Sequence, residues 1–369
     1  MRAILLAFLL CAAPAGADTL RVATFNVDLA RDGPGLLLHE LTTEPEARAL
    51  AAVRIVQAVR PDVLVIQKFD HDLRGRALAA FADLLRTGPE GIDYPHRFHA
   101  GVNAGVPSGL DLDGDGLPMG WDDALGWGKH PGHGGMAVLS RLPLDGAGAR
   151  SFRGLLWRDL PEAGAPLLDE AARAVLPLSS RSHWDVPVIL PGGGRLHLLT
   201  AHPTPPLFGP EGVNRPRNRD EVLFWVHYLD GFAFRDDQGR EAGAPEGPLV
   251  LLGDMNLDPV DGEGEGEAMR RLLTHPRLRD PEPASEGAAE AARTQGGANG
   301  RHEGRPALDT ADWRDAPGPG NLRVDYVLPS REVEVGAAGV FWPAPGEPLA
   351  ELLAEGPAHR LVWADIRLP

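Results

Sequence analysis

Polar side chains of the types that carry out acid–base chemistry stand at the ends of six apolar stretches of this sequence. They are Asn26, Lys68 with Asp70, His202, Asp254 with Asn256, Asp325, and His359. Asp and Asn are also frequent turn formers after strands, so each one alone has a structural explanation. The convergence of six such positions favours one shared site at the edge of a sheet.

Two pairs among these residues indicate hydrolytic chemistry. The segment GDMNLDP places Asp254 and Asn256 two residues apart, so both side chains point to the same side of an extended backbone. A carboxylate and an amide in this arrangement can hold an attacking water and a phosphate oxygen. Asp325 and His359 are a candidate acid–base couple, in which the carboxylate fixes the imidazole tautomer and the second ring nitrogen faces the substrate.

Short apolar strands and fewer helices must position these side chains. We predict strands over 19–27, 62–67, 135–141, 185–190, 195–202, 248–256, 323–330 and 359–368, and helices over 44–60, 77–86, 217–232 and 266–275. The alternation is too irregular for a doubly wound parallel sheet. We expect instead two mixed β-sheets packed face to face with helices outside, an α/β (α+β) architecture.

No internal repeat or composition break divides the chain, so residues 18–369 are predicted to form a single domain. Residues 281–320 are rich in Ala, Gly, Glu and Pro without periodicity, and are predicted to be a long surface loop. The 43% hydrophobic content is sufficient for a large core.

The first 17 residues have the pattern of a signal peptide. Arg2 precedes an apolar stretch too short for a membrane span, and Ala15-Gly16-Ala17 is a small-residue cleavage site before Asp18. A lipoprotein, processed at Cys11, is the less favoured interpretation, because the leucines before Cys11 are too bulky for the usual small-residue processing site. We therefore expect a secreted protein, periplasmic or extracellular, with no membrane span and no cysteine after cleavage.

The charge balance argues against large polyanionic partners. The formal net charge is −16, and removal of Arg2 with the signal peptide makes it −17. Long-range repulsion makes nucleic acid a less favoured partner and leaves small phosphoesters open. Without cysteine, any metal ion must be bound by oxygen or imidazole ligands.

Seven motifs, in this order along the chain, resemble the endonuclease/exonuclease/phosphatase superfamily. They are TFNV, PDVLVIQ, GGMAVLSRLPL, LLTAHPTPP, LLGDMNLDP, RVDYVLPS and PAHRLVWADI. The resemblance implies a four-layer α/β sandwich and divalent-metal phosphoester hydrolysis, with Mg²⁺ or Mn²⁺ as the cofactor. The family acts on nucleic acids, inositol polyphosphates and sphingomyelin, so it does not define the substrate.

The resemblance also implies a role for each matching residue. Asn26 corresponds to a metal-site or phosphate-contacting asparagine, and His202 to a phosphate-contacting histidine. Asp254 corresponds to the carboxylate that orients the nucleophilic water, with Asn256 as its companion donor. Asp325 and His359 correspond to the paired aspartate and histidine of the site. Arg141, after VLS, is expected near the substrate.

Two positions depart from the family pattern. Where the family has a glutamate as principal metal ligand, this chain has Lys68, and the usual Ser-Asp-His motif is Pro357-Ala358-His359. Both changes remove oxygen ligands that Mg²⁺ requires. Three accounts remain: Lys68 itself stabilises phosphate, Asp28 and Asp70 bind a displaced cation, or catalysis is lost. The expected function is thus a phosphoesterase-like hydrolase with a modified metal site acting on a small-molecule or lipid-linked phosphoester. The alternative is a phosphoester-binding pseudoenzyme.

A second candidate cation site is the segment DLDGDGLPMGWD. Asp111, Asp113 and Asp115 alternate, and Asp122 is the twelfth residue, as in a helix–loop–helix calcium loop. Pro118 and the absence of flanking helices do not fit that motif. A structural calcium loop and an acidic solvated turn therefore both remain open.

The remaining features give weaker indications. The eight tryptophans are predicted to pack in the core rather than to stack on bases, because no stretch interleaves them with clustered Lys and Arg. The basic segment 215–219 is interpreted either as a phosphate clamp or as the start of a helix.

Overall fold

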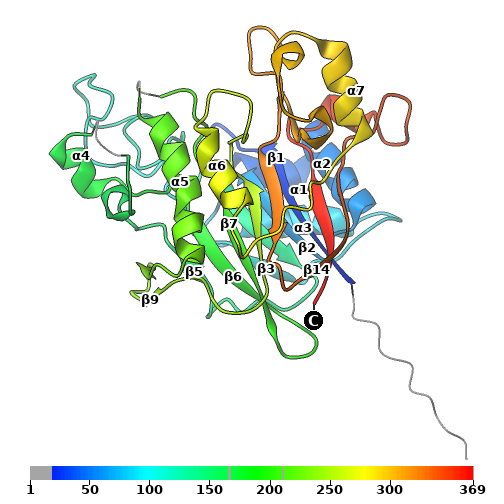
Figure 1. The fold of residues 1–369 in the computed structure, drawn as a ribbon, viewed down its shortest axis with the longest axis horizontal. Coiled ribbons are helices and arrows are strands. Elements are labelled where there is room, and N and C mark those ends of the chain that lie inside the picture. Colours follow the sequence, from blue (N-terminus) through cyan, green and yellow to red (C-terminus); the bar gives the residue numbers. More distant parts are fainter. Residues whose placement is uncertain (1–18, 165–167, 210–211, 369) are drawn as a thin grey trace, which may run out of the picture.

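The computed structural model describes residues 19–164, 168–209 and 212–368 (Figure 1). The predicted signal peptide, residues 1–17, lies outside the described residues. Within them, no helix is both long and apolar enough to cross a lipid bilayer.

The first large sheet has six strands in the order β14-β15-β1-β2-β4-β3. In chain order these are β1 (Thr19–Leu29), β2 (Val63–Phe69), β3 (His96–Phe98), β4 (Gly135–Ser140), β14 (Glu334–Val340) and β15 (Val362–Arg367). Strands β1 and β2 are parallel and every other neighbouring pair is antiparallel. Because parallel neighbours require a crossover, the chain between β1 and β2 forms helices α1 (Leu36–Thr43) and α2 (Ala47–Val59).

The second large sheet has five strands in the order β13-β10-β7-β6-β5. They are β5 (Arg150–Ser151), β6 (His183–Ile189), β7 (Arg195–Ala201), β10 (Leu249–Asp254) and β13 (Asp325–Pro329). Here β7 and β10 are the parallel pair, and helix α5 (Asn214–Leu229) lies in the crossover between them.

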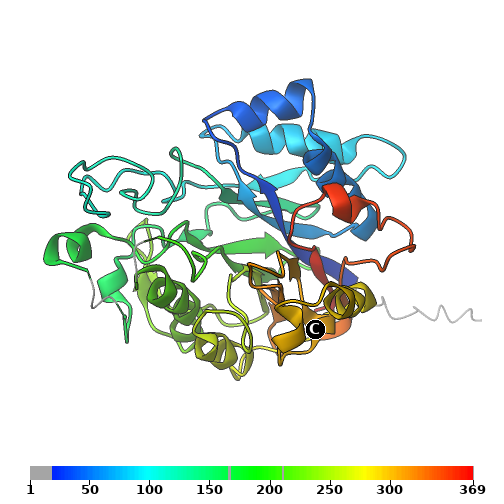
Figure 2. The same ribbon diagram turned by 90° about the horizontal axis from the view of Figure 1, so that it is seen from above.

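The two sheets pack face to face between layers of helices, as Figure 2 shows. Successive side chains of a strand point to opposite faces of the sheet and so belong to two different cores. In β2, Val63 and Val65 pack against the second sheet, whereas Leu64 and Ile66 pack under helices α2 and α3 (Arg76–Arg86). On the other side, α5 and α6 (Gly266–Leu273) cover the second sheet. The predicted four-layer arrangement of two mixed sheets with helices outside is confirmed.

The segment 281–320 corrects the prediction of a long surface loop. It contains helix α7 (Glu286–Gln295), whose first turn is capped by the Ser285 hydroxyl accepting the backbone N–H of Gly287. Ala288 is fully buried in the core between the sheets. Alanine favours helix strongly, but its small side chain gives little hydrophobic periodicity, so pattern reading missed this helix.

Short elements complete the described chain. They are α4 (Glu170–Val175), α8 (Leu352–Glu355), β8 (Phe234–Arg235), β9 (Glu241–Ala242), β11 (Ala311–Asp312) and β12 (Asn321–Leu322), with 3₁₀ turns at Trp157–Asp159, Asn299–Arg301 and Pro306–Leu308. Among them, α4, β11 and β12 lie in or next to segments that line the site described next.

Candidate active site

The carboxyl ends of both parallel strand pairs open into one cleft of about 1390 Å³. At the strand ends, its polar lining comprises Asn26 of β1, Lys68 of β2, Arg181 before β6, His202 after β7, Asp254 and Asn256 at the end of β10, and His359 before β15. The structure therefore brings together six of the residues that the sequence pointed to, and adds Arg181. Asp325 lies behind His359 rather than in the lining.

Asp254 is the centre of this group. Its side chain is fully buried. The Oδ2 atom accepts a hydrogen bond from the side-chain amide of Asn26 at 2.9 Å and lies 3.4 Å from the side-chain amide nitrogen of Asn256. The Oδ1 accepts the backbone N–H of Asn256 at 2.9 Å. Burial raises the pKa of Asp254, but the imidazoles of His359 and His202 outweigh burial and hold the pKa well below its usual range. Asp254 is therefore a carboxylate at neutral pH.

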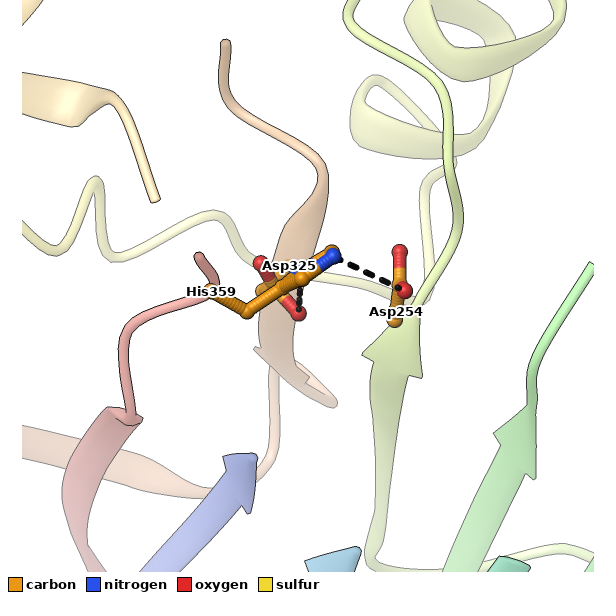
Figure 3. A group of neighbouring side chains, drawn as sticks. All are labelled: Asp254, Asp325 and His359. Carbon is orange, nitrogen blue, oxygen red and sulfur yellow. Dashed lines mark hydrogen bonds and ion pairs between the residues drawn. The ribbon is translucent and has the colours of Figure 1, made fainter. Parts of the chain in front are cut away.

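His359 lies between two carboxylates, as Figure 3 shows. Its Nδ1 is 3.0 Å from Asp325 Oδ2, and its Nε2 is 3.7 Å from Asp254 Oδ2. Burial lowers the pKa of His359, but the charges of Asp325 and Asp254 raise it above its ordinary value overall. Burial also raises the pKa of Asp325 to about 6. The arrangement favours an imidazolium at position 359.

Thr310 fixes the Asp325 carboxylate. Its hydroxyl donates to Asp325 Oδ2 at 2.9 Å and accepts the backbone N–H groups of Val324 and Asp325. The ring of Trp313 packs edge-on against His359 at 5.2 Å. Sequence reasoning missed both residues, because they lie in the segment that was predicted to be a loop without structure.

His202 is the second imidazole at Asp254, with its Nε2 3.3 Å from Asp254 Oδ2. Complete burial lowers its pKa to about 4, against the opposing effect of Asp254. A neutral His202 therefore donates its Nε2 proton to the carboxylate. Its buried Nδ1 has no partner among the described residues.

Lys68 lines the cleft beside Asn26, and its ammonium Nζ lies 2.7 Å from Asp28 Oδ1. The other oxygen of Asp28 accepts a hydrogen bond from the guanidinium of Arg48 at 2.7 Å, so this carboxylate lies between two cations. Lys68 and Asp28 both have positive φ angles, 55° and 48°, where irregular pairing interrupts β1 and β2. Such a backbone is sparsely populated by residues other than glycine, and it turns both side chains out of the strand alternation.

Asp70 does not face the cleft. Its two oxygens accept the backbone N–H groups of Arg31, at 2.8 Å, and Gly134, at 2.9 Å, and thereby join the loops that follow β1 and precede β4. Asp70 is thus a buried structural carboxylate, and Asp28 is held by cations. All four carboxylate oxygens are thus already engaged, and a displaced cation at these two residues stays a prediction.

Arg141 also departs from its expected place. It lies just after β4 at the end of the sheet where β2 begins, and its guanidinium pairs with Asp62 at 2.7 Å. Because β4 is antiparallel to β2, this end is the one opposite Lys68. Arg141 is therefore not part of the cleft.

Arg181 is the cationic residue that sequence reasoning missed. It is only 7% exposed and lines the cleft. Among the described residues its guanidinium makes a single hydrogen bond, a long one of 3.4 Å from Nε to the carbonyl of Gly134. Burial lowers its pKa, and the carboxylate of Glu221 opposes this shift. Its two terminal nitrogens therefore remain free to bind an anionic group in the cleft.

Glu221 of α5 anchors the two segments that carry Arg181 and His202. Its carboxylate accepts the backbone N–H of Ser180 at 2.6 Å and that of Thr204 at 2.7 Å. One buried helical carboxylate thus joins the connections before β6 and after β7. The signal in the sequence was weak, since Arg181 follows two serines with no spacing relation to the other motifs.

At the positions where the resemblance implies the metal ligands of the family, few oxygen donors are present. Lys68 places an ammonium there, the Asn26 Oδ1 accepts the backbone N–H of Asp28 at 3.1 Å, and residue 358 is alanine. One buried group does bring its ligand atoms within 4.8 Å of one another, namely Asp254, Asp325 and His359. There a cation would have to displace the proton that the two carboxylates hold on His359.

The acidic loop 111–122 keeps part of its predicted arrangement. Asp111, Asp113 and Asp115 place oxygen atoms within 4.8 Å of one another at the surface. Asp122 does not join this group and lines the cleft instead. Each of the three carboxylates also accepts a backbone N–H within the loop, so an acidic turn stabilised by its own hydrogen bonds explains the loop as well.

Two further expectations are resolved by the geometry. Arg217 of the basic segment lies inside α5 and donates to the backbone carbonyls of Leu178, Pro177 and Leu125, so this segment begins a helix and does not form a phosphate clamp. Trp121 and Trp127 are 52% and 42% exposed, so not all tryptophans pack in the core.

Comparisons with known proteins agree with this fold. The family model described as Endonuclease/Exonuclease/phosphatase family matches residues 23–347, and the chain belongs to this family. Its fold is similar to that of an endonuclease/exonuclease/phosphatase from Beutenbergia cavernae DSM 12333, with 23% identity, a TM-score of 0.54, and 95% of this chain and 72% of that chain covered. A family protein from Leptotrichia buccalis C-1013-b is 14% identical, with a TM-score of 0.51 and 95% and 100% covered. The search of curated proteins gave no match.

Proposed function

We propose that this protein hydrolyses small phosphoesters, and that side-chain cations replace the divalent metal ion of its family. The observation that carries the proposal is the position of Lys68, Arg181 and His359 in one cleft with the carboxylate of Asp254. Three cations near one phosphate supply the electrostatic stabilisation that phosphoryl transfer needs.

The residues suggest a direct displacement by water. Asp254 orients the water, whose oxygen forms the new bond to phosphorus while the bond from phosphorus to the alcohol oxygen breaks. The water proton passes to Asp254, and the departing oxygen takes a proton from the His359 imidazolium, which Asp325 holds in place. In a loose transition state the water has formed little of its bond to phosphorus, so it does not need a strong base. The low pKa of Asp254, which makes it a weak base, is therefore compatible with this role.

Lys68 and Arg181 bind the non-bridging phosphate oxygens in this proposal. Arg181 has two free nitrogens in a rigid plane, which suits bidentate binding of phosphate. The 43% exposed side chain of Lys68 reaches the cleft from the opposite sheet. The phosphate would therefore lie between the strand ends of the two sheets.

A second candidate function is phosphoester binding without turnover. It is favoured by one observation: Asp28 already neutralises the Lys68 ammonium at 2.7 Å. If the pair stays closed when substrate binds, Lys68 adds little charge stabilisation. Turnover then depends on Arg181 and His359 alone.

Chromogenic phosphomonoesters and phosphodiesters separate these functions. We expect turnover that EDTA does not abolish and that added Mg²⁺, Mn²⁺ or Ca²⁺ changes little. Arg181→Met should lower kcat/KM by about 100-fold or more, as expected for loss of an oxyanion-stabilising donor, while Arg141→Met serves as the matched control. Calorimetric binding of inorganic phosphate without turnover of any ester would establish the binding function instead.

Two further proposals concern location and calcium. We propose that the protein is exported, on the basis of the leader-like residues 1–17, and fractionation of cells with antibody detection tests this. We also propose that the carboxylates of Asp111, Asp113 and Asp115 bind calcium in a structural role, supported by their close approach.

A further inference from the structure

The cleft is much larger than a phosphate group requires. Its volume of about 1390 Å³ exceeds the roughly 300–1,000 Å³ typical of small-ligand pockets. The polar residues described above occupy only the part at the strand ends. The remaining space is therefore available to the group to which the phosphate is attached.

Apolar side chains from four separate segments line this remaining space. They include Leu112 and Trp127 from the acidic loop region, Leu176 after α4, Phe208 after β7, and Trp313 with Leu322 around β11 and β12. Both ribbon views place the 111–127 segment and α4 at the same end of the molecule (Figures 1 and 2). Trp127 is 42% exposed and Phe208 is 81% exposed, so apolar surface continues to the mouth of the cleft.

The charged side chains in these walls are mainly acidic. Asp111, Asp122, Asp169 and Glu263 line the cleft, against the exposed Arg314. The other basic wall residue, Arg217, is occupied by three backbone carbonyls. A second anionic group on the substrate would therefore meet negative charge, whereas an apolar or uncharged group would not.

From this distribution we infer that the natural substrate is an amphiphilic phosphoester, with one phosphoryl group joined to a long apolar chain and no second anionic group. The inference rests on the proposed function, because the phosphate must bind at Arg181 and Lys68. The apolar chain then lies along the walls formed by Trp127, Leu176 and Phe208. Burial of such a chain supplies affinity that a small phosphate cannot obtain from polar contacts alone.

Alkyl phosphonates test the inference independently of turnover, since their carbon–phosphorus bond is not a phosphoester. Binding of butyl, hexyl and octyl phosphonate is measured by calorimetry, below the concentration at which they aggregate. Each buried methylene should tighten binding about fourfold, so octyl phosphonate should bind roughly two hundredfold more tightly than butyl phosphonate. Equal affinity of the butyl and octyl compounds would overturn the inference.

Variants of the walls locate the chain. Trp127→Ala and Phe208→Ala should each flatten the dependence on chain length, measured as the ratio of the octyl to the butyl phosphonate affinity. Leu73→Ala is the matched control, because Leu73 is 90% exposed and outside the cleft. A chain-length dependence that survives both wall variants unchanged would contradict the assignment.

A charge comparison completes the test. Octyl phosphonate should bind at least tenfold more tightly than an octane chain with a phosphonate at each end, since the second phosphonate meets the acidic walls. Equal binding of the two would overturn the charge argument. Turnover of short phosphoesters without chain-length preference would refute this inference and leave the proposed function standing, whereas tight octyl binding with no turnover of any ester would refute hydrolysis alone.

Discussion

Asp254 and Asp325 are register partners across β10 and β13, and the imidazole of His359 lies between their carboxylates. The antiparallel pairing therefore sets the spacing of the two carboxylates, and a hydrogen bond from Thr310 holds the carboxylate of Asp325 in place. Because Asp325 is hidden behind His359 and does not line the cleft, the proposed function lets it act on substrate only through the imidazole.

The first prediction concerns the pH dependence of phosphoester turnover. The pKa of His359 is raised, so its imidazolium persists to higher pH than a free histidine, and activity should fall as pH rises through that pKa. Asp325→Asn removes one raising charge and should shift the basic limb of kcat/KM to lower pH. The measurement is a pH profile of both proteins, with Asp159→Asn as an exposed control. A basic limb that does not move would contradict the role of His359.

The second prediction restores the ligands of the family. Lys68→Glu combined with Ala358→Asp should create phosphoesterase activity that depends on Mg²⁺ or Mn²⁺ and is abolished by EDTA, because two carboxylates replace an ammonium and a methyl group. Lys68→Glu alone should lose metal-independent activity by about tenfold or more. If the double variant shows no metal dependence, the scaffold has lost more than these two ligands.

The third prediction concerns stability and involves Asp309, a buried carboxyl next to Thr310. Burial, with the charges of Asp258 and Asp261, raises its pKa from 3.8 to about 8. A raised carboxyl pKa means that the folded state prefers the neutral acid. The stability it contributes is fully present below about pH 4 and is lost as pH rises to about 8.

Asp309→Asn, which is neutral at every pH, should therefore be more stable than the parent at pH 8. The difference should shrink by up to about 1.4 kcal/mol per pH unit towards pH 4. Urea unfolding at several pH values measures it, with the exposed Asp83→Asn as control. A difference independent of pH would mean that Asp309 is not protonated in the folded protein.

The fourth prediction tests the acidic loop with terbium, which substitutes for calcium. Trp121 lies within the loop and Trp127 follows it, so bound Tb³⁺ should show emission sensitised by tryptophan, and Ca²⁺ should displace it. Asp113→Asn should weaken binding by about tenfold, since the charge count of a site tunes its affinity. Glu170→Gln, in α4 outside the loop, is the control. Emission that Asp113→Asn leaves unchanged would place the ion elsewhere.

The sequence was sufficient to predict eight of the eleven strands of the two large sheets and the residues at their ends, whereas β3, β5 and β14 were not predicted. Buried strands such as β2 and β10 are continuous apolar runs, and the first polar residue after each run marks the sheet edge. For this reason Asn26, Asp254 and His359 could be predicted to lie together before any coordinates existed. Family membership then followed from the order of the motifs.

Other parts of the site depend on contacts that no local pattern encodes. Arg181 is placed by Glu221, which is far away in the sequence, through the backbone of Ser180. Asp28 pairs with two cations, whereas Asp70 accepts two backbone N–H groups, and the sequence near each residue does not indicate these partners. Arg141 was misplaced because a motif gives the sequence neighbour of a strand but not which end of the sheet faces the cleft.

Under the proposed function, the exchange at position 68 changes how the cleft obtains its positive charge. A dissociable ion occupies its site in proportion to its free concentration, whereas a lysine is covalently present in every molecule. Dilution, chelators or scarcity of divalent ions would leave this charge in place. Because the ammonium is attached to the chain, it can occupy only the positions that the lysine side chain reaches. A free ion could instead shift with the shape of the bound ligand.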